Sequence, residues 1–150
     1  MIICKRTNSE SPDFQKLVKA LDADLSERNG DQHGFYDQFN KIDSIKHAIV
    51  AYENEMPVGC GAIKEYSGDT MEVKRMYVPP ANRGKGIASH VLSTLETWAG
   101  ELNYKKCILE TGEKQPEAIR LYKKNNYRII PNYGQYEGVS NSVCFEKKLK

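Results

Sequence analysis

The segment Arg83-Gly84-Lys85-Gly86-Ile87-Ala88 has the residue types of a phosphate-binding loop. Its glycines let the backbone turn and approach a ligand closely, and an amphipathic helix is predicted to begin directly behind them. Unpaired amides and the dipole at a helix N-terminus attract anions, and the two basic side chains add positive charge. A glycine-rich turn with solvated basic residues is the alternative. We interpret the segment as a candidate pyrophosphate site.

Two common nucleotide motifs are missing from the sequence. A P-loop requires GxxxxGK followed by Ser or Thr, and a dinucleotide fingerprint requires GxGxxG after the first strand of a parallel unit, with an acidic residue about 20 positions later. Neither pattern occurs in the chain. The loop therefore fits another kind of diphosphate ligand better.

A longer match around this loop indicates a family. The run from Val73 to Ala88 resembles the acetyl-CoA signature of the GNAT superfamily of N-acetyltransferases, Arg/Gln-x-x-Gly-x-Gly/Ala, which Arg83, Gly86 and Ala88 match. A second family signature, Asn-x-x-Ala-x-x-Leu-Tyr followed by a Gly/Asn-Phe/Tyr pair, is similar to the run from Gln115 to Tyr122 with Asn126-Tyr127. Gln115 departs from the usual Asn but keeps its amide on a longer arm.

The resemblance implies acetyl-CoA as co-substrate and no metal. It also implies that the strand before the loop splays from its neighbour, so that its backbone binds the pantetheine arm; ordinary strand pairing is the alternative. The implied cofactor-binding residues are Met76, Val78, Arg83, Gly84, Lys85, Gly86, Ile87, Ala88, Gln115 and Tyr122.

Catalysis needs a proton acceptor and a proton donor. A lysine-like amine, with a pKa of roughly 10.4, must lose a proton before it attacks a thioester. Glu72 resembles the glutamate base of histone-type family members, although a solvated charge at a strand edge is equally compatible; Glu110, on the next strand, is a second candidate. Tyr122 resembles the family tyrosine that protonates the departing thiolate, and an amphipathic core tyrosine is the alternative.

Candidate substrate contacts lie in segments where family members vary. They are Tyr36, in the aromatic-containing stretch from Asp31 to Ser44, Glu110, and Tyr133, in the segment from Pro131 to Tyr136. Lys64, Arg75 and Arg120 could hold an acceptor carboxylate, or could form a solvated basic face.

The resemblance predicts direct transfer of an acetyl group from acetyl-CoA to a primary amine in a ternary complex. A small-molecule acceptor such as an amino acid is favoured over a protein. Two alternatives remain open: an acetyl-CoA sensor without catalytic activity, and an acyltransferase that uses a longer acyl-CoA.

Hydrophobic periodicity places the elements that must position these residues. Ser11 with Pro12 predicts a helix start, with serine as the N-cap. Strands are expected over Met1 to Arg6, Ala48 to Glu53, Val58 to Tyr66, Thr70 to Val78, Lys106 to Thr111 and Ser142 to Leu149, and helices over Pro12 to about Asn29, Ile87 to about Gly100, and Pro116 to Asn125. With the resemblance, this order predicts an α/β (α+β) fold: a GNAT-type mixed, mostly antiparallel sheet of about six to seven strands flanked by helices, with a β-α-β acetyl-CoA-binding core.

Composition limits the remaining possibilities. Hydrophobic residues make up 39% and charged residues 28% of 150 residues, which predicts one folded domain over residues 1–150. No apolar run reaches the roughly 20 residues of a membrane helix, and a net charge of +2 without a long basic run argues against nucleic acid. The four cysteines lack metal-ligand spacing and are expected to be buried and reduced, which predicts a cytoplasmic protein. A homodimer is possible.

Overall fold

The computed structural model describes residues 1–29 and 45–149. Within them, a seven-stranded sheet has the order β1-β2-β3-β4-β5-β7-β6. The strands are β1 (Ile2–Thr7), β2 (His47–Glu53), β3 (Met56–Ser67), β4 (Thr70–Tyr77), β5 (Lys106–Gly112), β6 (Arg128–Ile130) and β7 (Ser142–Lys148). Every neighbouring pair is antiparallel except β4 and β5, which run parallel. The predicted mixed, mostly antiparallel sheet is confirmed.

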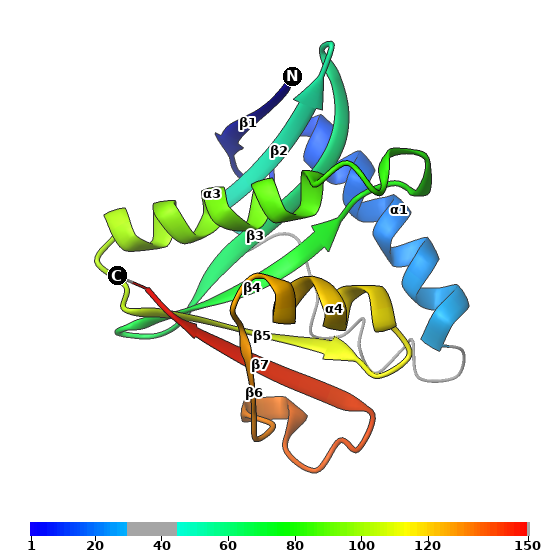
Figure 1. Ribbon diagram of the computed structural model, residues 1–150. Coiled ribbons are helices and arrows are strands. Elements are labelled where there is room, and N and C mark those ends of the chain that lie inside the picture. Colours follow the sequence, from blue (N-terminus) through cyan, green and yellow to red (C-terminus); the bar gives the residue numbers. More distant parts are fainter. Residues whose placement is uncertain (30–44, 150) are drawn as a thin grey trace.

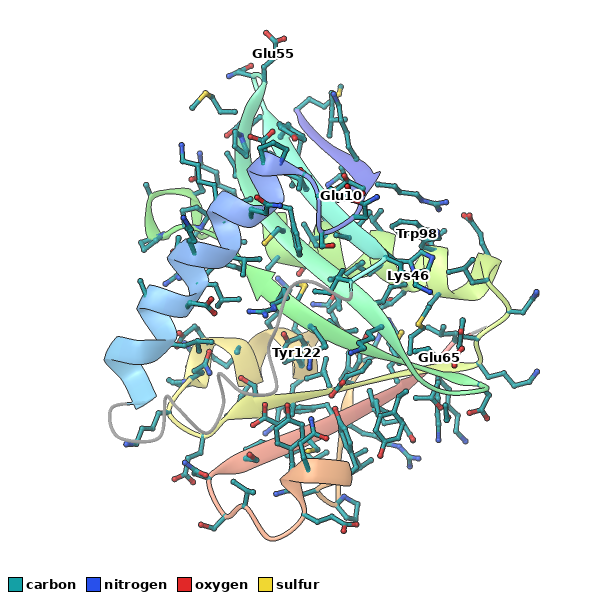
Figure 2. The ribbon with its side chains drawn as sticks, turned by 180° about the vertical axis from the view of Figure 1, so that it is seen from behind. Glu10, Lys46, Glu55, Glu65, Trp98 and Tyr122 are labelled. Carbon is teal, nitrogen blue, oxygen red and sulfur yellow. The ribbon has the colours of Figure 1, made fainter. Side chains whose placement is uncertain are left out.

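Helices cover both faces of the sheet. Helices α3 (Ile87–Glu101) and α4 (Pro116–Lys124) lie on the face turned toward the viewer in Figure 1, and α1 (Pro12–Asn29) lies on the opposite face, seen from behind in Figure 2. Each face has its own apolar core. One core joins β2 and β3 to α1, and the other joins the sheet to α3 and α4. The segment from β4 through α3 to β5 is the predicted β-α-β unit.

The start of α1 confirms the predicted cap. The backbone amide of Phe14 donates a hydrogen bond to Ser11 Oγ at 3.2 Å, and Pro12 occupies the first helical position. An N-cap side chain satisfies one of the amides that a helix leaves unpaired at its start. Phe14, Leu17, Val18 and Leu21 then turn the buried face of α1 onto the sheet.

Two details differ from the sequence prediction. The sequence placed the third strand from Val58, but the turn before it contains only Asn54 and Glu55, both with positive φ (51° and 67°), so β3 begins earlier, at Met56. A two-residue hairpin with positive φ at both positions matches the twist of its strands. Strand β6 was not predicted as an element, because three residues are too few to show a strand periodicity.

Helix α3 packs unusually closely on β3. A Cβ atom placed on Gly61 would lie 2.5 Å from Met76 Sδ and 2.9 Å from Leu95 Cδ1, and one on Gly59 would lie 2.8 Å from Ile87 Cγ2. These two glycines therefore make room for the helix and for Met76. They fix how deeply the N-terminal end of α3 sits against the sheet.

Several features bear on the environment of the protein. Within residues 1–29 and 45–149, no helix is long and apolar enough to cross a membrane. In the same ranges, no three His, Cys, Asp or Glu side chains form a metal-binding group. Three of the four cysteines are buried and Cys4 is half-buried, close to the expectation from sequence.

Candidate active site

The parallel strands β4 and β5 pair only at their beginnings. Their register runs from Thr70 with Lys106 to Glu72 with Ile108, although β4 continues to Tyr77 and β5 to Gly112. Beyond Glu72 the two strands diverge, as Figure 1 shows. The edge of β4 that faces β5 therefore leaves the sheet ladder at this point, as the family resemblance implied.

A bulge in β4 redirects the side chains beside this opening. Cys60 pairs with Tyr77 and Ala62 with Lys74, so β4 has one residue more than β3 over this stretch, and Arg75 has a positive φ of 62°. Bulges re-aim side chains and are frequent next to active sites. Here the Arg75 guanidinium reaches Asp22 of α1, with Nη1 and Oδ1 3.2 Å apart.

A cavity of about 570 Å³ lies between the end of β4, the loop after it, and helices α3 and α4. Gly84 and Gly86 both line it with positive φ (83° and 78°), and a Cβ on either would meet no atom within 4 Å. Glycine is needed there for the backbone conformation rather than for space. Gly86 is the N-cap of α3 and makes no side-chain cap, so the first amides of α3 remain available at the cavity wall. This wall suits a diphosphate.

The other residues predicted for this loop have different surroundings. Arg83 lines the cavity, and its Nε donates a hydrogen bond to the Val78 carbonyl at 2.8 Å, which ties the loop to the end of β4. Lys85 does not line this cavity; its Nζ lies 3.4 Å from Glu53 Oε1, and its side chain is 48% exposed. Ile87 is buried in the core and also lines the cavity. Ala88, Met76 and Val78 line the cavity.

A smaller cavity of about 110 Å³ opens between β4 and β5, beside Leu21 and Leu25 of α1. Its polar lining includes Glu72, Lys74 and Glu110. The two cavities share five lining residues: Leu21, Met76, Gln115, Ala118 and Tyr122. They therefore meet where the strands part.

Tyr122 lies at this junction. It comes from α4 and is 6% exposed, with its ring packed against Tyr127 and Phe145 at centroid distances of 5.8 and 5.7 Å. Figure 2 shows it in the opening between β4 and β5. Burial, and then the negative charge of Glu110, raise the pKa of the phenol. Tyr122 is therefore a protonated hydroxyl at neutral pH, able to donate hydrogen.

Glu110 is a half-buried carboxyl group in the smaller cavity. Ser142 Oγ donates a hydrogen bond to its Oε2 at 2.8 Å. Burial raises the pKa of Glu110 to about 7, an effect that Glu72 adds to and that Ser142 and Lys74 oppose. A carboxyl group with this pKa can both accept and release a proton near neutral pH.

Glu72 is held by two neighbours. Tyr133 Oη donates a hydrogen bond to Glu72 Oε2 at 2.6 Å, and Lys74 Nζ lies 3.6 Å from Oε1. Burial and the charge of Glu72 raise the pKa of Tyr133, so the phenol keeps its proton. Tyr133 lines neither cavity and contacts the site through Glu72 and through Tyr136, whose ring centroid lies 5.7 Å from its own. Tyr36, the remaining predicted substrate contact, lies outside the described residues.

The basic residues suggested as carboxylate-binding groups are spread over different places. Arg75 borders the smaller cavity and forms an ion pair with Asp22. Arg120 lines only the larger cavity, and Lys64 lines neither. The sequence therefore named three basic residues of which one lies beside the candidate acceptor site.

Four residues of the site were not singled out from sequence. Lys74 and Ser142 contact Glu72 and Glu110, Tyr136 lines the smaller cavity, and Asn125 Nδ2 donates to Ser89 Oγ at 3.1 Å, joining α4 to α3. Only Lys74 could have been predicted from the sequence, because it lies two positions after Glu72 in β4 and therefore on the same face of the strand. The others depend on contacts between distant segments.

Comparisons with known proteins agree with this architecture. Residues 12–127 match the family model described as Acetyltransferase (GNAT) family. The chain is 36% identical over 102 residues to an IAA acetyltransferase from Azospirillum brasilense, with 67% of each chain covered. It is 41% identical over 85 residues to the uncharacterized N-acetyltransferase YjgM from Escherichia coli. That match covers 55% of this chain and 50% of YjgM.

A solved structure extends the likeness to the whole chain. A Klebsiella pneumoniae protein assigned to the acyl-CoA N-acyltransferases shares 27% identity with a TM-score of 0.84, covering 100% of this chain and 99% of the other. A GNAT family acetyltransferase from Elizabethkingia anophelis, solved with acetyl-CoA bound, has the same fold at 19% identity, with a TM-score of 0.72 and coverage of 99% and 98%. These matches confirm the predicted class of enzyme, an acetyl-CoA-dependent N-acetyltransferase: the chain belongs to the GNAT family of acetyltransferases.

Proposed function

We propose that this protein transfers an acetyl group from acetyl-CoA directly to a primary amine, with both reactants bound together. The observation that carries the proposal is the meeting of two cavities at Tyr122, where β4 and β5 part. One cavity has a wall suited to a diphosphate, and the other contains titratable carboxyl groups. Two reactants could therefore approach the same point from opposite faces of the sheet, which favours a ternary complex over an acyl-enzyme.

The larger cavity is the proposed acetyl-CoA site. Acetyl-CoA supplies an acetyl group activated as a thioester. The first amides of α3 and the turn at Gly84 and Gly86 would bind the pyrophosphate, and the unpaired edge of β4 near Met76 and Val78 would hold the pantetheine arm. Lys85 would assist only by leaving Glu53, because its ammonium now lies against that carboxylate.

Glu110 is the proposed proton acceptor. It lines the smaller cavity, which is the proposed acceptor cavity, and its negative charge adds to burial in raising the pKa of the Tyr122 phenol. The sequence favoured Glu72 for this role, and that prediction stays open. The contacts of Glu72 with Tyr133 and Lys74 support a different part for it, as a fixed charge that shapes the cavity.

Tyr122 is the proposed proton donor. As the new carbon–nitrogen bond forms and the carbon–sulfur bond breaks, its hydroxyl would donate hydrogen to the sulfur. Its raised pKa keeps the proton in place until that moment. Gln115, which lines both cavities and makes no side-chain cap to α4, is placed to contact the cofactor near the junction.

The wider predictions remain proposals. We propose a single domain over residues 1–150, because the first and last described strands belong to one sheet. A small-molecule acceptor is proposed because the acceptor cavity is small. A cytoplasmic location and a homodimer remain predictions.

The direct test is calorimetric titration with acetyl-CoA, followed in the same sample by amines with detection of free thiol. Binding followed by thiol release is expected. Binding without release for any amine would favour the sensor alternative, and release with propionyl-CoA faster than with acetyl-CoA would favour a longer acyl donor. Absence of acetyl-CoA binding would refute the proposed function.

A further inference from the structure

The acceptor cavity has an uneven charge balance. Among the described residues, its lining contains two cationic side chains, Lys74 and Arg75, and two carboxyl groups, Glu72 and Glu110. Both cations already lie beside a carboxylate of the chain: Lys74 Nζ is 3.6 Å from Glu72, and Arg75 Nη1 is 3.2 Å from Asp22. The Lys74–Glu72 pair is largely shielded from water, with side chains 9% and 10% exposed, whereas in the second pair Arg75 is 2% exposed and Asp22 is 37% exposed.

Glu110 differs from the other three. Its carboxylate accepts a hydrogen bond from the Ser142 hydroxyl, and no lysine, arginine or histidine of the described residues forms an ion pair with it. When Glu110 is ionised, it adds to the cavity a negative charge that no cation of the described residues pairs with, although the nearby charge of Lys74 favours it. A half-buried carboxylate without an ion-pair partner is a favourable place for an ammonium group.

The surroundings of Glu110 favour a cation with an apolar remainder. Tyr136 lines the same cavity, close enough to Glu110 and Glu72 for their charges to raise the pKa of its phenol. An aromatic ring beside carboxylates attracts an alkylammonium ion. Leu21, Leu25 and Val73 supply apolar wall. A volume of about 110 Å³ admits on the order of five to ten non-hydrogen atoms, given roughly 10–15 Å³ for one water.

We propose that the acceptor is a small primary amine with a single positive charge and no acidic group. This inference rests on the proposed function and narrows it. An acceptor carboxylate would enter a cavity whose cations are already paired and whose extra charge is negative. A second ammonium would find no second unbalanced carboxylate. The inference departs from the amino acid that the family resemblance favoured.

Three amines of equal chain length test the inference: n-butylamine, 4-aminobutanoate and 1,4-diaminobutane. With acetyl-CoA and free-thiol detection, kcat/KM for n-butylamine should exceed that for each of the others by about tenfold or more, the effect of one unbalanced charge in a buried site. Equal values, or a preference for 4-aminobutanoate or the diamine, would overturn the inference. Acetyl-CoA binding with turnover of none of the three would also overturn it, whereas failure to bind acetyl-CoA would remove the proposed function itself.

Two variants should shift the preference in opposite directions. Glu72→Gln leaves the Lys74 charge without its carboxylate, so the discrimination against 4-aminobutanoate should fall by about tenfold. Lys74→Met leaves Glu72 unbalanced, so 1,4-diaminobutane should gain on n-butylamine by a similar factor. Glu113→Gln, an exposed position outside the cavity, is the control and should leave the ratios unchanged. Lys74→Met keeps the test decisive if Glu72→Gln is inactive. Unshifted ratios in an active variant would refute the charge argument.

Discussion

Replacing Glu110 with glutamine should lower activity and raise stability at alkaline pH. The pKa of Glu110 is raised from 4.5 to about 7 in the folded protein, chiefly by burial. The folded state therefore binds this proton more tightly than the unfolded chain does. The stabilisation is fully present below about pH 4.5 and is lost as the pH rises to about 7. A shift of this size corresponds to about 3 kcal/mol, at roughly 1.4 kcal/mol for each pKa unit.

The glutamine variant cannot ionise, so it avoids this loss. Between pH 5 and pH 8, the free energy of unfolding of the wild type should fall relative to that of Glu110→Gln by about 2–3 kcal/mol. Urea unfolding at the two pH values measures the difference directly. Glu113→Gln, an exposed acid-to-amide change, should show no such pH-dependent difference.

The same variant tests the catalytic role. In the wild type, kcat/KM should rise with pH through about 7, because only the ionised carboxylate accepts a proton. In Glu110→Gln this rise of kcat/KM with pH should disappear, and the rate of thiol release should fall by about 10²- to 10⁴-fold. If the variant keeps the rise with pH, another group titrates. A variant with wild-type pH dependence of stability would show that Glu110 is not held protonated by burial.

Two further predictions concern the cofactor side of the site, and a third concerns the packing of α3 on β3. Tyr122→Phe should lower kcat by at least about tenfold with unchanged acetyl-CoA affinity by calorimetry, since it removes a hydrogen donor but keeps the packed ring; equal kcat would exclude the donor role. Gly86→Val should weaken acetyl-CoA binding by at least about tenfold, because a β-branched residue is strained at a φ of 78°, and normal affinity in a folded variant would contradict the loop assignment. Gly61→Ala should cost about 1–3 kcal/mol in urea unfolding, because its Cβ would meet Met76 Sδ at 2.5 Å; an unchanged midpoint would mean that Met76 moves freely.

Local patterns were enough to predict most elements. The stripe from Phe14 to Leu21 and the Ser11 cap placed α1, and the glycine loop with the run after it placed α3, because helix periodicity and caps act within one or two turns. The sequence did not predict β6, whose three residues depend on pairing with β7. The resemblance predicted a mixed, mostly antiparallel sheet, but the order of its strands was not predicted, because it depends on pairing between distant segments.

The contacts that give the site its chemistry join segments far apart in the chain. Tyr133 and Glu72 are 61 residues apart, and Ser142 and Glu110 are 32 apart. No periodicity or motif encodes such pairs, because they follow from how β7 and the segment before it pack beside β5. The sequence could name Glu72 and Glu110 as candidates. Which of them lies beside Lys74, and which has its pKa raised by burial, depends on the tertiary structure.

The arrangement links the proposed acid and base electrostatically. Ionised Glu110 raises the pKa of Tyr122, so the phenol holds its proton most firmly while the base is ready to accept one. Once Glu110 has taken a proton from the amine, that negative charge disappears, and the phenol becomes a better donor at the time when the sulfur needs hydrogen. Because Glu110 and Tyr122 both lie at the opening between β4 and β5, the charge of Glu110 acts both on proton removal from the amine and on hydrogen donation to the sulfur. A neutral replacement at position 110 should therefore weaken proton acceptance while making the Tyr122 phenol more acidic, and the two effects can be separated by following tyrosinate absorbance at high pH.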